Sequence, residues 1–547
     1  MISRRDFLRK TGETSLAITA AAATGIRTSS TEPVERDQLG EAGRTRRAFE
    51  IRCDRARDDT REGSGIVTNG DEERYPDRRG SFSKTLPHND LGEVDISAYA
   101  DWLSLLAAGE FDRLDQIRRD LQAEAKLNNP QAAYAFDLVG LDSHATHLAP
   151  PPAFASGRMA VEMAELYWQA LVIDVPFRNY ETSILIRDAV SDINAFSAPL
   201  SSPSSQKITA KTLFRGETAG DLVGPYISQF LWLDIPYGLK TIDQRYRCPA
   251  RSQSFLVDTT EWLACQRGAS PRKKLWFEST PRYICSNREL AEYVHRDFSF
   301  QSYLNAALIM LQFGDQALSP TNPYLGAKAQ FGDITFGGKN ILSMVAQAAL
   351  LGQKSSFYHK WLVHRRLRPE SFAGRIEMHL SGRKFYDIDS QILNCDAVNR
   401  IQAANDSRLL PVAFPEGSPT HPSYPAAHAC TAGACVTILK GFFNEDFPLT
   451  DPVEATADGS ALTPWKGESL TLGNEINKLG NNIALGRDAA GVHFRSDSIN
   501  GLFLGEEQAL CLLCDYSRTY HERFDGFVLT TLNGEKVRIL NGELERV

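Results

Sequence analysis

Three short motifs in the second half of the chain carry residue types that together could bind an oxyanion. They are Lys360 with Arg368, the segment 422–428 that ends in His428, and the segment 486–497 that holds Arg487, His493 and Asp497. Three permanent cations and two imidazoles suit a phosphate-like anion better than a metal cation, because lysine and arginine donate hydrogen bonds and cannot ligate a metal. The motifs therefore predict an anion-binding site.

Lys360 and Arg368 can face one cavity if both lie on a helix. They are eight positions apart, which turns one side chain about 80° from the other around the helix axis. The lysine offers a point charge, whereas the arginine offers a planar fork for two oxygens. Pro369 is expected to mark the end of that helix. Taken alone, the pair could be solvated basic residues next to His364, but the other two motifs favour a site.

The segment before His428 leads into an apolar stretch that is expected to be helical from about Ala429. The free N–H groups of the first turn and the positive end of the helix dipole would seat an anion. We expect His428 to lie at the rim of that seat.

The third motif needs a bend between its arginine and its histidine. Arg487 and His493 are six residues apart and cannot share one helical face, so a bend is expected at Gly491. His493 and Asp497 are four apart and can face each other across one turn. An aspartate that accepts from one imidazole nitrogen fixes the tautomer and leaves the other nitrogen free to bond.

The composition limits the class of protein. The chain has 547 residues, 42% of them hydrophobic, with 23% charged and a net charge of −8, which allows a large core. The acidic balance excludes nucleic acid as an expected partner. The nine scattered cysteines are an odd number in a large chain and do not indicate a disulfide scaffold.

The amino terminus resembles a twin-arginine export signal over residues 1–27, with Arg4 and Arg5 followed by a modestly apolar stretch. That stretch is too short for a stable membrane span. We expect the protein to be exported to the periplasm, the cell envelope or the medium. Residues 28–90 are rich in Arg, Asp, Glu, Ser and Gly and are expected to be a poorly ordered extension.

The rest of the chain predicts a mostly α fold. Apolar residues recur at steps of three and four in five long segments. These segments are 158–173, 287–313, 341–363, 430–443 and 501–524. Residues 527–531 and 536–539 alternate around Asn533-Gly534 and predict a small β hairpin. We expect a first helical bundle region at 91–340 and a second at 341–547, with the site in the second.

The order Lys-x7-Arg-Pro, Pro-x-x-His and Arg-x5-His-x3-Asp resembles the superfamily that joins vanadium-dependent haloperoxidases to type 2 phosphatidic-acid-phosphatase-like acid phosphatases. The seven residues between Lys360 and Arg368 are similar to the algal and cyanobacterial bromoperoxidases, whereas the phosphatase pattern has six. Residues 214–230 resemble the same bromoperoxidases, and the likeness runs from about Glu162 to Tyr520.

The resemblance implies two four-helix-bundle-like halves, assembly into a homo-oligomer, a vanadate cofactor and room for a structural calcium. It implies hydrogen peroxide, bromide or iodide and a small organic acceptor as substrates, with hypohalous acid as the product. In the family the residue matching His493 is the vanadium ligand, and Lys360, Arg368 and Arg487 would offset the charge of vanadate. His428 would move protons, and Lys360 would polarise a peroxide oxygen.

Two features bear on activity and halide choice. Ala426 and Ala427 stand where the family has Ser-Gly, so a hydroxyl donor to the oxyanion is missing. A lost hydrogen bond to a charged group is worth roughly 1.5–3 kcal/mol, so we expect weaker vanadate retention. His421 matches the bromoperoxidases and favours bromide or iodide over chloride, while Phe357 replaces a tryptophan or arginine of relatives. The alternatives are an acid phosphatase that uses His493 as nucleophile, and an oxyanion-binding homologue weakened in catalysis.

Overall fold

The computed structural model describes residues 41–61, 67–200 and 207–547. In this part of the chain the fold is mostly helical, with a few short antiparallel strand pairs, which confirms the predicted class. The proposed export signal at 1–27 lies outside the described residues and stays a prediction. None of the helices in the described ranges is long and apolar enough to cross a membrane.

The α-helices of the described residues range in length from 4 to 23 residues. They are α2 (Glu41–Arg61), α3 (Asp71–Arg74), α4 (Ile96–Ala108), α5 (Phe111–Leu114), α6 (Gly157–Leu171), α7 (Ile184–Ile193), α8 (Thr259–Gln266), α9 (Asn287–Arg296), α10 (Gln301–Gln312), α11 (Gly338–Tyr358), α12 (Pro369–Leu380), α13 (Ser390–Leu393), α14 (Asp396–Asn405), α15 (Ala427–Phe442), α16 (Leu472–Ala489) and α17 (Arg495–Ser517).

Shorter helical turns connect these helices. They are the 3₁₀ turns η2 (Pro130–Tyr134), η3 (Ser143–Ala145), η4 (Phe177–Asn179), η5 (Gln229–Leu231) and η6 (Asp315–Ala317), and the π-helical turn η7 (His359–His364), which directly continues α11.

The strands form three small antiparallel sheets. Two are hairpins, β1 (Ile235–Tyr237) with β2 (Lys240–Ile242) and β3 (Val453–Ala455) with β4 (Leu462–Pro464). The third contains β5 (Phe527–Thr530), β6 (Lys536–Leu540) and β7 (Glu543–Arg546). Its first pair is the hairpin that the sequence predicts, and Gly534 takes the positive φ of 83° that the turn requires.

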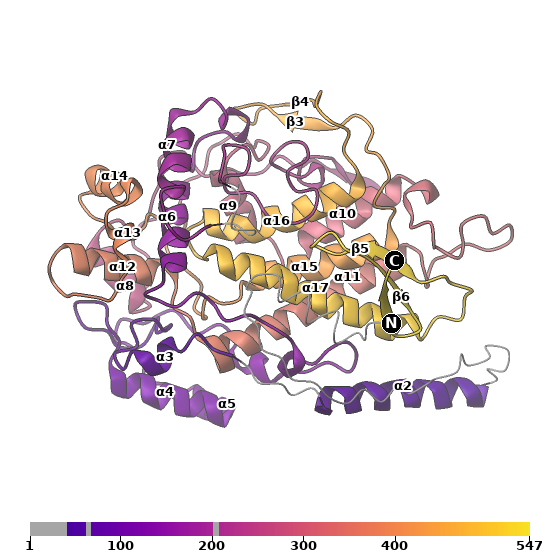
Figure 1. The fold of residues 1–547 in the computed structure, drawn as a ribbon, viewed down its shortest axis with the longest axis horizontal. Helices are drawn as coiled ribbons and strands as arrows, with labels where there is room; N and C mark the ends of the chain where they lie inside the picture. The colour runs from indigo at the N-terminus through magenta and orange to yellow at the C-terminus, as the bar shows by residue number, and fades with distance from the viewer. Residues whose placement is uncertain (1–40, 62–66, 201–206) are drawn as a thin grey trace.

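The predicted helical segments all form helices, but two are divided. Segment 287–313 splits into α9 and α10, and segment 341–363 passes from α11 into the π-helical turn η7. The centre of the molecule is formed by α11, α15, α16 and α17, which lie alongside one another (Figure 1). Their apolar faces join α10 and the β5–β7 sheet in one hydrophobic cluster, and α6, α7, α12 and α14 bury a second one. Both hydrophobic clusters contain residues from before and after position 340. The predicted division into a first bundle region at 91–340 and a second at 341–547 stays a prediction.

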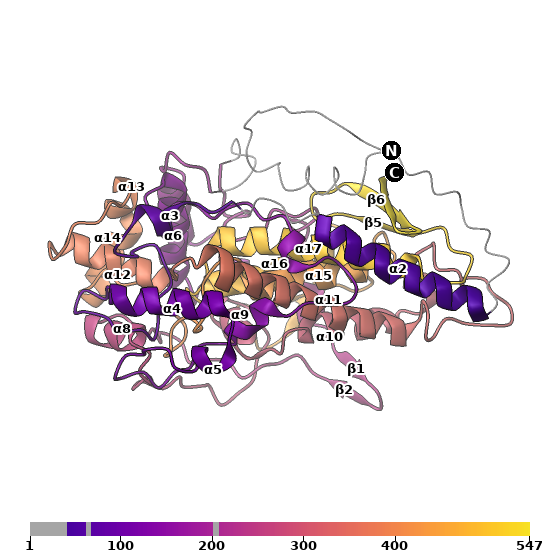
Figure 2. The same ribbon diagram turned by 90° about the horizontal axis from the view of Figure 1, so that it is seen from below.

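The expectation of a poorly ordered extension over residues 28–90 is wrong for its described part. Residues 41–61 form α2, which runs along the outside of the molecule (Figure 2). The Arg47 guanidinium donates to the Arg518 carbonyl at 2.9 Å, and Arg518 pairs with Asp54 at 3.1 Å. Farther on, Phe82 and Leu86 are buried. The segment has few hydrophobic residues of its own. It is nevertheless ordered, because it contacts residues that lie hundreds of positions away in the sequence.

The helices α15 and α17 approach closely because glycine faces backbone at their crossing. A Cβ on Gly433 of α15 would collide with the carbonyl oxygen of Leu502 in α17, and a Cβ on Gly505 would collide with the carbonyl of Cys430. The close crossing holds the start of α15, which carries His428, beside the start of α17, which carries Asp497.

All nine cysteines are free thiols, and eight of them are buried.

We predict that Gly433→Ala destabilises the protein by about 1–3 kcal/mol, because the added methyl group must push α17 away. Thermal and denaturant unfolding would measure the change. Gly441→Ala on the same helix is the matched control, since a Cβ there meets neighbours only at 3.4 Å or more. Equal stability of the Gly433 variant and the wild type would contradict the proposed backbone contact.

Candidate active site

Lys360 and Arg368 reach the site from two different elements. Lys360 lies on the π-helical turn η7, and the chain then reverses at Arg365, whose φ is 41°. Arg368 is the N-cap of α12 and Pro369 is its first residue. The expectation that Pro369 ends a helix is therefore wrong: it begins one, where its missing N–H is not needed and its fixed φ suits the first turn.

Both cations are buried and hold the loop before α15. The Lys360 ammonium donates to the carbonyl oxygens of Pro422 at 2.8 Å and Ser423 at 2.7 Å. The Arg368 guanidinium donates to His421 Nδ1 at 2.9 Å and to His493 Nε2 at 2.9 Å. Two of the three ammonium hydrogens of Lys360 are thus engaged with backbone, and one is left for another acceptor.

His493 is fixed in one orientation between Asp497 and Arg368. Helix α16 ends at Ala489, and Gly491 makes the predicted bend with a φ of 76°. The His493 Nδ1–H donates to Asp497 Oδ2 at 3.0 Å, and Nε2 accepts from Arg368. This hydrogen-bond network assigns the proton to Nδ1, which leaves Nε2 with a lone pair that faces the cationic side of the site.

Asp497 is itself held by residues that the motif spacing does not reveal. Its Oδ1 accepts from Arg366 at 2.6 Å, and its Oδ2 accepts from the Phe494 amide at 3.0 Å and from the Ser423 hydroxyl. The Arg366 guanidinium lies 4.1 Å above the Phe494 ring and is 2% exposed. It is therefore a buried partner of Asp497 and not a solvated member of a basic run.

His428 sits on the first turn of α15, as predicted, and faces a partner from another helix. Ala426 is the N-cap, so the amides of Ala427 and His428 precede the first intrahelical bond, which runs from Cys430 to Ala426. His428 Nε2 lies 3.0 Å from Asp297 Oδ1, and the imidazole is 27% exposed. Asp297 follows α9 and lies 131 residues upstream, so sequence spacing gave no signal for it.

Arg487 is anchored by the same end of α9. Its Nη1 donates to the Val294 carbonyl at 2.8 Å, while its buried Nε has no partner among the described residues. The guanidinium lies 5.5 Å from the centre of the Phe414 ring. A buried guanidinium nitrogen is stabilised by an acceptor, so Arg487 can donate to an anion in the cavity.

A cavity of about 290 Å³ joins several of these groups. The residues that line it are Asn128, His295, Phe414, Glu416, Gly417, Pro419, His421, Ala427, His428, Arg487 and His493. Lys360, Arg368 and Ala426 lie behind this lining and are fully or almost fully buried. Phe357 also stands outside it and packs against His421 with ring centres 5.3 Å apart.

Burial without a counter-anion perturbs the charged groups. Burial, reinforced by Arg368, holds the pKa of Lys360 well below its ordinary value. Burial lowers the pKa of Arg368 to about 9 and that of Arg487 to about 10. Burial and the nearby cations also hold the pKa of His493 far below that of a free imidazole. An oxyanion in the cavity would offset this repulsion, so the donor set fits a multiply charged oxyanion.

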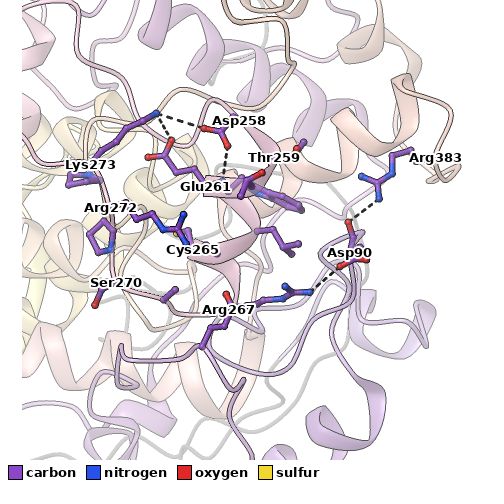
Figure 3. Close-up of a pocket in the computed structure, with 18 residues that line it drawn as sticks. Asp90, Asp258, Thr259, Glu261, Cys265, Arg267, Ser270, Arg272, Lys273 and Arg383 are labelled. Atoms are coloured by element: carbon purple, nitrogen blue, oxygen red, sulfur yellow. Dashed lines mark hydrogen bonds and ion pairs between the residues drawn. The ribbon is translucent and has the colours of Figure 1, made fainter.

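A larger pocket of about 540 Å³ beside α8 has different chemistry (Figure 3). Most of its charged side chains are already paired. Lys273 binds Glu261 at 2.8 Å, and Arg267 binds Asp90 at 3.3 Å. It contains none of the predicted site residues, and we assign the chemistry to the smaller cavity.

Comparison with known proteins identifies the fold and the family. Residues 376–516 match the second helical-bundle domain of vanadium chloroperoxidase-type proteins. The chain is 32% identical over 506 residues to the vanadium-dependent bromoperoxidase of Ascophyllum nodosum, covering 87% of this chain and 89% of that one. It is also 32% identical to the vanadium-dependent bromoperoxidase of Corallina pilulifera, covering 84% and 90%.

The chain belongs to the vanadium-dependent haloperoxidase family. The structure of the second vanadate-dependent bromoperoxidase of Ascophyllum nodosum, described as homohexameric, superposes with a TM-score of 0.86 at 26% identity. That match covers 95% of this chain and 94% of the other. This protein is therefore an enzyme of the haloperoxidase class with the family's helical fold.

In this haloperoxidase we predict that Arg366→Met weakens the binding of orthovanadate by about 10–100-fold, because Asp497 would lose the partner that orients it toward His493. Equilibrium titration of metal-stripped protein measures the affinity without any turnover. Arg365→Met is the matched control, since Arg365 pairs with Glu72 and does not touch Asp497. Unchanged affinity in a folded Arg366 variant, or equal weakening in both variants, would contradict this role.

Proposed function

We propose that the enzyme oxidises bromide or iodide with hydrogen peroxide and that vanadate is its cofactor. The orientation of His493 carries this proposal, because its unprotonated Nε2 accepts from the buried Arg368, and the charges of Lys360 and Arg487 also act on this imidazole. His493 would ligate vanadium, and Lys360, Arg368 and Arg487 would offset the charge of vanadate.

A structural calcium has no support among the described residues. They contain no group of three or more His, Cys, Asp or Glu that could hold a metal ion.

Bound vanadate would supply a Lewis acid that activates peroxide, while the vanadium keeps its oxidation state. The overall reaction joins one halide, one hydrogen peroxide and one proton to give hypohalous acid and water, so a proton must reach the departing oxygen. His428 would supply that proton, since it lines the cavity and its Nε2 is hydrogen-bonded to Asp297. The free ammonium hydrogen of Lys360 would polarise a bound oxygen.

The wall beside Arg368 bears on the choice of halide. His421 accepts from Arg368 through Nδ1, and Phe357 packs on the His421 ring. His421 lines the cavity, and the Phe357 ring supports it from behind, so this part of the wall carries an imidazole and no additional cation. We propose that bromide and iodide, which lose their hydration more easily, are used in preference to chloride.

Assembly and location complete the proposal. The homohexameric relative supports a homo-oligomer for this chain as well. The twin-arginine pattern at residues 1–27 supports export to the cell envelope or beyond. Size-exclusion chromatography with light scattering and fractionation of expressing cells would test these two points.

We predict that metal-stripped protein brominates phenol red only after orthovanadate is added, with bromide and hydrogen peroxide present. His493→Ala should lose the activity, because the cofactor loses its ligand. Loss of activity in the variant with retained folding supports the assignment. Bound orthovanadate without activity toward bromide or iodide would contradict the proposed function and leave an acid phosphatase or an oxyanion-binding homologue.

We predict that Ala426→Ser tightens orthovanadate binding, because the site gains a hydroxyl donor to a charged oxygen. A bond of this kind contributes roughly 1.5–3 kcal/mol, or about one to two decades of affinity. Ala432→Ser is the matched control, since Ala432 is also fully buried but lies inside α15, six residues beyond the N-cap position of Ala426. Equal affinities of the wild type and the Ala426 variant would show that the hydroxyl cannot reach the anion.

A further inference from the structure

The catalytic cavity shares a wall with a second hollow of about 430 Å³. Asn128, Glu416 and Pro419 line both spaces. Ala269, Ser270 and Pro271 line the hollow and also border the pocket beside α8, where Figure 3 labels Ser270. The hollow is therefore next to the cavity in which the oxidised halogen would form.

The wall between the two spaces is built rigidly around Glu416. His295 Nε2 lies 2.7 Å from Glu416 Oε1, and its Nδ1 lies 3.0 Å from Glu292. The His295 ring stacks on Phe414 with centres 3.8 Å apart and an angle of 17°. On the other side, the Lys84 ammonium donates to the carbonyl oxygens of Glu416 at 2.9 Å and Ser418 at 2.6 Å.

The charge that the hollow presents to a ligand is negative. Lys84 is the one cationic side chain among the described residues that line it, and it is 5% exposed and paired with Glu370 at 3.2 Å. Glu416 is 47% exposed, and the exposed Glu124 accepts from the Ser270 hydroxyl at 2.5 Å. Carboxylates attract an ammonium group and repel another carboxylate.

The hollow also has features that suit an aromatic ring with a hydroxyl group. Ala125, Ala269, Pro271 and Pro419 supply apolar surface. Ser418 lines the hollow at 1% exposure, and its hydroxyl has no hydrogen-bond partner among the described residues. This hydroxyl is therefore available to hydrogen-bond with a polar group of a ligand.

We propose that this hollow binds the organic acceptor and selects electron-rich phenols that carry an ammonium group over those that carry a carboxylate. This inference rests on the proposed halide oxidation. The hypohalous acid transfers its halogen to a ring carbon: the carbon–halogen bond forms, the oxygen–halogen bond breaks, and the ring proton leaves with hydroxide as water. Glu416 would bind the ammonium group while the ring points toward the catalytic cavity.

Three matched phenols test the selection, namely cationic tyramine, neutral tyrosol and anionic phloretate. With vanadate-loaded enzyme at fixed bromide and peroxide, we expect kcat/KM to fall in that order. Glu416→Gln should reduce the ratio of tyramine to phloretate about fivefold, the effect expected of one partly exposed charge pair. Because both rates come from one enzyme, changes in halide oxidation cancel in the ratio.

Glu261→Gln is the matched control, since Glu261 pairs with Lys273 in the pocket beside α8 and does not line the hollow. Its ratio should equal that of the wild type. A wild-type ratio identical to that given by hypobromous acid added to the three phenols without enzyme would overturn the proposal, because the acceptor would then react only in solution.

Equilibrium binding of tyramine separates this inference from the proposed function, because binding needs neither bromide nor peroxide. We expect binding to the wild type that weakens about fivefold in Glu416→Gln. Binding that is absent or insensitive to this substitution would overturn the acceptor site. Failure to brominate any of the three phenols would instead contradict the halide oxidation.

Discussion

The carboxylate of Asp497 receives hydrogen bonds from three separate segments of the chain. His493 and the Phe494 amide come from its own turn, Ser423 comes from the loop before α15, and Arg366 comes from the loop before α12. These bonds fix the imidazole tautomer and hold the three segments together. Among the carboxylates that act on Lys360 and Arg368, Asp497 offsets their charge most strongly.

The site stores unfavourable electrostatics that an anion would relieve. Lys360, Arg368 and Arg487 are buried close to His493, and the pKa of each is lowered by burial. Such a cluster costs folding free energy, and the tight glycine-mediated crossing of α15 and α17 resists its separation. Affinity for an oxyanion follows from this arrangement, since the ligand meets positive groups that are already oriented.

The end of α9 organises the opposite side of the cavity. Val294 holds Arg487 through its carbonyl, His295 holds Glu416, and Asp297 holds His428. Three residues within four positions of the chain thus hold Arg487, the wall toward the neighbouring hollow and His428. This side therefore brings Arg487 to the anion site and Glu416 to the hollow that is suited to a cationic acceptor.

The sequence by itself determined the mostly helical fold and the bend at Gly491, because these depend on periodicity and local spacing, and it supplied the residues that we propose for the anion site. Only the tertiary structure decided that Pro369 begins a helix, that residues 41–61 and 67–90 are ordered, and that Arg366 supports Asp497. It also decided the pairing of His428 with Asp297 and the hollow beside Glu416. Partners that lie more than a hundred residues apart leave no trace in local spacing, because packing alone brings them together.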